Sequence, residues 1–104
     1  MHRIAALLAL MAGCAAAAAD PAPARRAELL HLVRQDCGSC HGLTMKGGLG
    51  PSLEPAALAE KDAEQMRFVI LHGRRGTPMP PWSGFLSESE ARWIVEQLRK
   101  GLPR

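Results

Sequence analysis

Residues 37–41 read Cys-Gly-Ser-Cys-His, and this pentapeptide constrains the chain more than any other feature of its sequence. The pattern Cys-x-x-Cys-His is the attachment signature of a c-type haem. Its spacing lets the thiols of Cys37 and Cys40 each form a thioether with one haem vinyl group, and His41 can then bind the iron. The motif predicts one covalently bound haem c, whose iron carries the chemistry.

Two other kinds of site use the same cysteines. Cys37, Cys40, His41 and His72 would formally supply the four ligands of a zinc site. The cysteine pair alone could form a redox-active dithiol, but that interpretation needs a βαβ context, and no segment shows strand alternation. The histidine that directly follows the second cysteine favours haem over both alternatives.

Residues 1–24 are predicted to be a signal peptide followed by a disordered lead. A single arginine precedes an apolar run and a stretch of small residues, which are the three parts of an export signal. Cleavage is expected after Ala19 or after Ala24, and residues 25–104 are expected to form one domain. The chain is therefore predicted to be exported.

Cys14 lies within the signal segment, in the sequence Met11-Ala-Gly-Cys14, which resembles a bacterial lipoprotein signal. Acylation would make Cys14 the new N-terminus and a lipid anchor. Leucine is usual where Met11 stands, and the alternative is that Cys14 is lost with the signal peptide. On either interpretation Cys14 is not a disulfide partner for the motif cysteines.

The expected domain has little material for an apolar core of its own. The chain contains two Phe, two Trp and no Tyr. Domains of this size seldom gain enough stability from a core alone, so a buried porphyrin is expected to be the largest core element. Twelve Lys and Arg against nine Asp and Glu in residues 25–104 give a net charge of +3, without the long basic run typical of nucleic-acid binding.

Periodicity and capping signals predict an all-α fold with three main helices. The first spans 26–36 and leads into the haem motif, the second starts at Asp62 and ends at Gly73, and the third spans 88–100. Glycines and prolines are expected to prevent regular structure from Gly38 to Pro55, before a short helical turn over 56–60. The apolar stripe of the first helix comprises Leu29, Leu30, Val33 and Cys37.

The second and third helices are expected to begin with capping boxes, Asp62 with Gln65 and Ser87 with Glu90. The second helix is apolar nearly all round, so it is expected to be well buried. Its apolar residues are Met66, Phe68, Val69, Ile70 and Leu71. The buried stripe of the third helix comprises Ala91, Ile94, Val95 and Leu98.

Met79 is the best candidate for the second iron ligand, in the loop Gly76-Thr-Pro-Met-Pro-Pro-Trp82. Prolines on both sides of Met79 restrict the backbone and can present the thioether in a fixed direction. The other candidates are Met45, Met66, His31 and His72. Met45 is close to the motif, Met66 lies mid-helix, and the two histidines are expected at the surface or at helix ends. Arg74 and Arg75 precede this loop and are expected to face an acidic redox partner, to pair with a haem propionate, or to lie in a solvated turn.

In combination, Cys37-Gly-Ser-Cys-His41, Gly50-Pro-Ser-Leu53 and Thr77-Pro-Met-Pro-Pro-Trp82, followed by a C-terminal helix with Trp93-Ile94, resemble the class I monohaem cytochromes c. The resemblance spans residues 27–100. It implies the small class I fold wrapped around one haem. It further implies that the Pro51 carbonyl accepts a hydrogen bond from the ring of His41, that Trp82 lies near the haem edge, and that Trp93 lies near the crossing of the terminal helices.

More narrowly, residues 36–51 and 86–94 are similar to cytochrome c55X of denitrifying bacteria. That family is associated with cytochrome cd1 nitrite reductase and with making its haem d1. The resemblance implies a periplasmic, non-enzymatic carrier of single electrons to or from the nitrite reductase system. The alternatives are an electron acceptor or accessory protein in haem d1 maturation, or a haem sensor that binds a small ligand at a displaceable sixth position.

Overall fold

The computed structural model describes residues 20–104, in which helices alternate with loops and no strand occurs. The elements in order are α1 (Pro23–Leu32), the π-helical turn η1 (Val33–Cys37), α2 (Gly38–His41), α3 (Pro55–Leu58), α4 (Ala63–His72) and α5 (Glu88–Lys100). The all-α prediction is confirmed. Cys14 and most of the predicted signal segment lie outside the described residues. Within residues 20–104, no helix is long and apolar enough to cross a bilayer.

Helix α1 begins at Pro23, before the predicted start at residue 26. Proline suits the first turn of a helix because it has no N–H group to leave unpaired there. The side chain of Arg26 donates from Nε to the carbonyl of Pro21 over 2.7 Å and so ties the preceding residues to the helix. The last two residues of the segment 1–24 are therefore helical, although they were predicted to belong to the disordered lead. The cleavage site itself stays a prediction.

The first helical segment also continues further than predicted, through η1 and α2 to His41. The prediction of irregular structure directly after Gly38 was therefore wrong for residues 38–41. A glycine inside a helix costs only about 1 kcal/mol relative to alanine. Gly38 is buried, and a Cβ atom at its position would lie 3.5 Å from Leu43 and Met45, so close packing is available to offset that cost. The helix ends at Gly42, whose φ is 91°.

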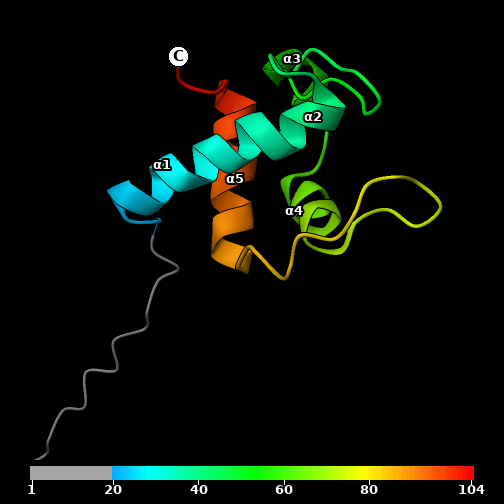
Figure 1. Ribbon diagram of the computed structural model, residues 1–104. Coiled ribbons are helices and arrows are strands. Elements are labelled where there is room, and N and C mark those ends of the chain that lie inside the picture. The colour runs from blue at the N-terminus through cyan, green and yellow to red at the C-terminus, as the bar shows by residue number, and fades with distance from the viewer. Residues whose placement is uncertain (1–19) are drawn as a thin grey trace, which may run out of the picture.

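Helix α5 forms the centre of the core, and α1 crosses it (Figure 1). Leu29 of α1 and Val33 of η1 are 0% and 1% exposed, and they belong to the same buried cluster as Ile94. Trp93 is 6% exposed and lies in this cluster, in agreement with its predicted place near the crossing. The predicted stripe of α5 is confirmed because all four of its residues are buried: Ala91, Ile94, Val95 and Leu98.

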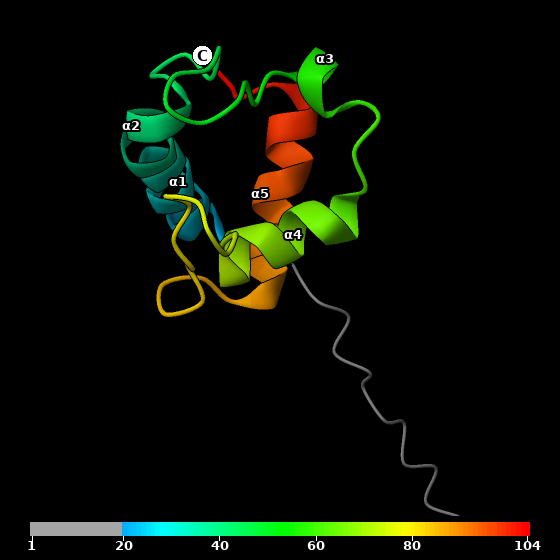
Figure 2. The same cartoon turned by 90° about the vertical axis from the view of Figure 1, so that its right-hand side faces the viewer.

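Helix α4 lies across the lower part of the molecule, and the long loop between α4 and α5 extends beside it (Figure 2). Asp62 caps α4 by accepting from the N–H groups of Glu64 and Gln65, but the returning bond from the Gln65 side chain that would complete the predicted capping box is not formed. Gly73 follows the last residue of α4, as predicted. The expectation that α4 is well buried was wrong. Only Leu71 is buried, and Phe68 is 57% exposed. The reason is that much of its apolar surface faces a cavity rather than other side chains.

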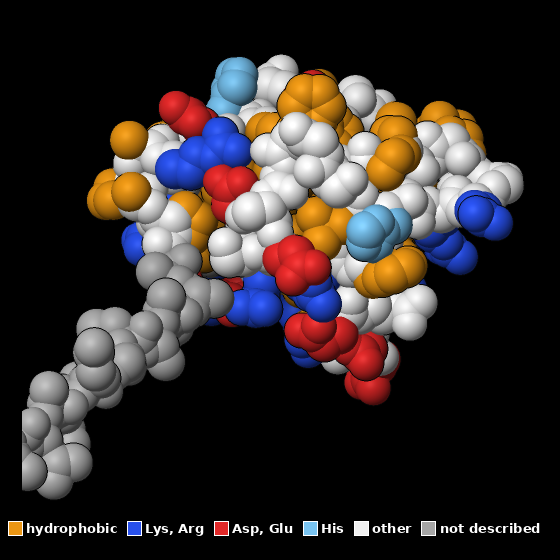
Figure 3. Space-filling view, turned by 90° about the horizontal axis from the view of Figure 1, so that it is seen from below, with side chains coloured by type: hydrophobic (Ala, Val, Ile, Leu, Met, Phe, Trp, Pro, Cys, Tyr) orange, Lys and Arg blue, Asp and Glu red, His pale blue; other side chains and the backbone are white. Residues whose placement is uncertain are grey.

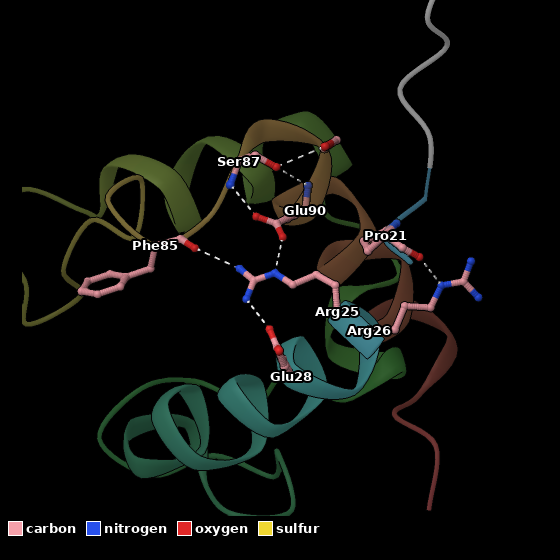
Figure 4. A network of polar contacts seen from close by, with 8 residues as sticks. Pro21, Arg25, Arg26, Glu28, Phe85, Ser87 and Glu90 are labelled. Carbon is pink, nitrogen blue, oxygen red and sulfur yellow. Dashed lines mark hydrogen bonds and ion pairs between the residues drawn. The ribbon is translucent and has the colours of Figure 1, made fainter. Parts of the chain in front are cut away.

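A polar network joins the start of α1 to the start of α5 (Figure 4). Arg25 donates from Nε to Glu90 over 2.5 Å, and it also pairs with Glu28 and contacts the carbonyl of Phe85. Glu90 accepts from the N–H of Ser87, while Ser87 accepts from the N–H of Glu90, so the predicted capping box is present. This network fixes the N-terminus of α5 against α1.

The hydrogen bond from Arg25, followed by that from the Ser87 backbone, lowers the pKa of Glu90 below its ordinary value of 4.5. A carboxylate with a lowered pKa stabilises the fold above its ordinary pKa, and this contribution is lost as the pH falls through the lowered pKa. Glu90→Gln keeps a capping-box residue but removes the charge. We expect it to be less stable than the native chain in urea at pH 7, and we expect this difference to shrink as the pH falls below 4.5 towards 3.

Glu28→Gln serves as the matched control because Glu28 pairs with the same arginine while its side chain is 66% exposed. Exposed pairs contribute little to stability, so this variant is expected to differ little from the native chain at either pH. Equal stability losses for Glu90→Gln at pH 7 and pH 3 would show that the charge of Glu90 does not stabilise the crossing.

Candidate functional site

A cavity of about 990 Å³ lies between the segment η1–α2, which carries the haem motif, and α4, α5 and the loop that follows α4. It lies at the upper end of the size range of ligand pockets, about 300–1,000 Å³. All six residues predicted to contact the haem line this one cavity, and they come from three separate parts of the chain. They are Cys37, Cys40, His41, Pro51, Met79 and Trp82.

The π-helical turn η1 sets which side chains of the first helical segment face this cavity. The N–H of Gly38 donates to the carbonyl of Val33, five residues earlier, where an α-helix would bond four residues earlier. The buried positions Leu29, Val33 and Gly38 are therefore spaced by four residues and then by five. Cys37 consequently lies at the cavity wall, although its spacing predicted a place on the stripe of Leu29 and Val33.

His41 is held by a backbone carbonyl and by a glycine. Its Nδ1 lies 2.7 Å from the carbonyl oxygen of Pro51, which is the contact that the family resemblance implied. The imidazole also packs against Gly50, where a Cβ atom would lie 2.7 Å from Cε1 and 2.8 Å from Nδ1. A protonated Nδ1 donating to Pro51 leaves Nε2 with a lone pair for a metal.

Of the candidates for the second ligand, Met79 and Met66 line the cavity. Met45 is only 5% exposed, in the core cluster, and is not among the cavity-lining residues. His31 and His72 are exposed and also lie away from the cavity wall. The ring of His72 packs instead on Phe68, with the centroids 4.6 Å apart. Of the five candidates for the second ligand, only Met66 and Met79 therefore lie at this cavity.

The cavity wall is mainly apolar, as a porphyrin requires. Part of this apolar surface comes from side chains of α4 and α5: Met66, Val69, Ile70, Ile94, Val95 and Leu98. Four carboxylate or cationic side chains also line the cavity, namely Asp36, Lys61, Asp62 and Arg74. Arg75 is exposed and is not among the lining residues, so the two neighbouring arginines have different surroundings. The residues present fit a flat, largely apolar group with polar edges.

The motif cysteines are not arranged as a reactive dithiol. Burial, followed by the negative charge of Asp36, raises the pKa of the free Cys37 thiol to about 11. Catalytic dithiols depend on a lowered pKa, because the thiolate is the nucleophile. The zinc alternative also lacks support, since no group of three or more His, Cys, Asp or Glu side chains within residues 20–104 could hold a metal ion. Both findings leave the haem interpretation as the one that the site fits.

Four large apolar side chains are exposed at the surface, and three of them lie outside the cavity. Leu43, Leu49, Phe68 and Phe85 are each more than half exposed, and Leu49 also lines the cavity. The face of the molecule seen from below shows hydrophobic side chains among acidic and basic ones, with no large area of one charge (Figure 3).

Comparison with known proteins agrees with this site. The profile of the family described as cytochrome c oxidase, cbb3-type, subunit III matches residues 24–97. Cytochrome c55X of Paracoccus denitrificans (strain Pd 1222) is 56% identical over 100 residues, which are 96% of this chain and 96% of that protein. The fold and the matches together define a small c-type cytochrome. The chain belongs to the cytochrome c55X family, and membership of the c-type cytochromes implies haem c as its cofactor.

One solved structure and one further relative are also similar to this chain. The solved structure of the c-type cytochrome NirC superimposes with a TM-score of 0.76 at 52% identity, and the match covers 77% of this chain and 94% of that one. A segment of dihydro-heme d1 dehydrogenase from Pseudomonas aeruginosa is 42% identical over 73 residues, which are 70% of this chain and 15% of that protein. The small class I cytochrome fold predicted for the chain is therefore confirmed.

Sequence reasoning assigned no role to Gly50 beyond its place in a family motif. The signal that could have identified it is its position directly before Pro51, whose carbonyl orients His41. A backbone that must approach a ligand side chain closely favours glycine.

Gly50→Ala is expected to displace the His41 ring and to destabilise the haem-loaded protein by about 1–3 kcal/mol, the usual cost of overpacking. Gly84→Ala is the matched control because a Cβ atom there would have no neighbour within 4 Å. Its stability should stay within about 0.5 kcal/mol of the native chain. The measurement is urea unfolding of the haem-loaded proteins, and equal stabilities of the two variants would contradict the packing role of Gly50.

Proposed function

We propose that this chain is an exported, non-enzymatic carrier of single electrons, in which Cys37 and Cys40 hold one haem covalently and His41 and Met79 bind its iron. The observation that carries this proposal is the single cavity that those four side chains line together. A haem bound there supplies a reversible one-electron couple between Fe(III) and Fe(II).

The surroundings of the cavity suit fast electron exchange without catalysis. Pro51 fixes the orientation of His41, so little rearrangement of that ligand is needed between oxidation states. The apolar side chains of α4 and α5 exclude water from much of the wall. A methionine thioether favours Fe(II) over Fe(III), so the pair of His41 and Met79 gives a comparatively high reduction potential.

The proposed partners belong to the nitrite reductase system. Support comes from the relatives, since this chain matches nearly the whole of a cytochrome c55X from a denitrifying bacterium. In the leading form of the proposal, the chain passes electrons to or from cytochrome cd1 nitrite reductase. Reduced protein should then be reoxidised when catalytic amounts of that enzyme and nitrite are added together.

The second candidate function is electron acceptance in haem d1 maturation. It is favoured by the similarity of this chain to a segment of dihydro-heme d1 dehydrogenase. Removing two hydrogens from a dihydro-tetrapyrrole releases two electrons and two protons, whereas a monohaem carrier accepts one electron. In this role, two molecules of the oxidised protein would be reduced for each haem d1 that such a dehydrogenase forms, and the protons would go to solvent.

Absorbance spectroscopy of the haem-loaded protein separates the two partner roles. We expect catalytic reoxidation with the reductase and nitrite, or a stoichiometry of two reduced chains per haem d1 with the dehydrogenase and its substrate. Bovine serum albumin in place of either enzyme controls for non-specific electron loss. If the protein exchanged electrons with neither enzyme, the proposed partners in the nitrite reductase system would be wrong.

The proposed location is the periplasm, either in soluble form or with a lipid anchor at Cys14. The contact of Arg26 with Pro21 supports cleavage after Ala19 rather than after Ala24, because the later site would remove residues that belong to α1. In the anchored form, the acylated Cys14 would precede the described domain by only a few residues. The mass of the purified mature chain distinguishes these forms.

Met79→Ala tests the proposed iron ligation. Loss of the thioether should lower the reduction potential by a measurable part of the roughly 0.8 V range that axial ligands span. It should also open one position of the iron, so that CO binds rapidly to the reduced form. The measurements are a redox titration and CO-binding kinetics.

Met66→Ala is the matched control, because Met66 is the other methionine of the cavity wall. If Met79 is the ligand, Met66→Ala should keep the low-spin spectrum and bind CO slowly. If Met79→Ala kept the native spectrum and potential while reduced Met66→Ala bound CO rapidly, the iron ligand would be Met66 and not Met79. Rapid CO binding to the native reduced protein would instead favour the sensor alternative.

A further inference from the structure

Backbone hydrogen bonds connect the loop that carries Met79 to the C-terminal end of α4. The N–H of Arg74 donates to the carbonyl of Met79 over 3.2 Å. Further along, the N–H groups of Trp82 and Ser83 donate to Ile70 and Leu71 of α4 over 3.0 and 3.1 Å. The loop therefore leaves α4, turns, and returns to it on both sides of the two prolines that follow Met79.

Gly73 lies where the outgoing and returning backbones meet. A Cβ atom at Gly73 would lie 2.6 Å from the carbonyl oxygen of Met79, 2.9 Å from the carbonyl carbon of Pro80 and 3.0 Å from the nitrogen of Pro81. All three neighbours are backbone atoms, which cannot rotate away as the end of a flexible side chain can. Any side chain at this position must therefore push the Met79 segment away from α4.

Thr77 makes a second contact that fixes the same turn. Its hydroxyl donates to the carbonyl of Arg74 over 2.7 Å and accepts from the N–H of Met79 over 3.3 Å. One hydroxyl thus bridges the start of the turn to the residue that carries the sulfur.

We propose that Gly73 and Thr77 are positioning residues for Met79, and that they set where its thioether lies in the cavity. This inference rests on the proposed function, in which Met79 binds the iron. Neither residue is proposed to bind the iron. Gly73 does not line the cavity. Thr77 does line it, but its hydroxyl contacts the backbone N–H of Met79. Their effect on the iron is therefore indirect and passes through the geometry of the turn.

The first test compares Gly73→Ala with Gly76→Ala. Both glycines have a positive φ, of 70° and 75°, so alanine meets backbone strain at either position. Only Gly73 has neighbours, since nothing lies within 4 Å of a Cβ atom at Gly76. We expect Gly73→Ala to shift the reduction potential downward and to accelerate CO binding to the reduced form, while Gly76→Ala matches the native protein in both measurements.

The second test replaces Thr77 and does not depend on whether Gly73→Ala folds. Thr77→Val removes the hydroxyl at nearly constant volume, and Thr77→Ser keeps it. The valine variant should bind CO several-fold faster than the native protein when reduced, and the serine variant should restore the native rate. A purely structural role would alter thermal stability in these variants without altering the potential or the CO rate.

Met79→Ala, measured beside these variants, separates this inference from the proposed function. Suppose that Met79→Ala allows CO to bind the iron rapidly, but that Gly73→Ala has the same potential and CO rate as Gly76→Ala, and Thr77→Val the same as Thr77→Ser. The positioning role would then be wrong, and Met79 would still be the iron ligand. If Met79→Ala leaves the spectrum and potential unchanged, the ligation is wrong and the positioning role falls with it.

Discussion

The structure depends on one continuous helical segment, α1 with η1 and α2, which contributes side chains both to the core and to the cavity wall. Leu29 and Val33 belong to the buried core cluster that contains residues of α5, and Gly38 is buried beside Leu43 and Met45. Cys37 and Cys40 lie at the wall of the cavity. The additional residue in η1 makes both placements compatible, because it turns the attachment motif relative to the buried stripe. In the proposed function, the haem completes a core that the protein leaves open on the inner sides of α4 and α5. Folding and cofactor binding would then be coupled.

The two proposed iron ligands are held in the same way, by backbone rather than by packed side chains. His41 contacts the carbonyl of Pro51, and its ring packs against Gly50. Met79 lies in a turn whose carbonyl packs against Gly73. Backbone atoms of short, proline-restricted loops move little, so such contacts can keep the ligands in place through changes of oxidation state.

Much of this site could be predicted from sequence because its signals are local. The haem motif, the capping box of α5 and the proline-flanked Met79 each lie within a few residues, and the structure places the predicted site residues at one cavity. The π turn could not be predicted, since periodicity analysis assumes a constant number of residues per turn. The burial of α4 was overestimated because its apolar residues Met66, Val69 and Ile70 line a cavity instead of packing in a protein core, while Phe68 lies outside that cavity and is exposed. The contacts of Gly50 and Gly73 join separate segments and needed the folded chain.

The proposed function requires that Cys37 and Cys40 hold one haem covalently in this cavity. The intact mass of the protein purified after export tests this requirement, under denaturing conditions that remove any group that is not covalently bound. We expect the mass of the processed chain plus one haem, and the mass of the unmodified chain for a variant in which both cysteines are replaced by alanine. A native chain that carries no added mass, with two free thiols or a disulfide, would contradict the account.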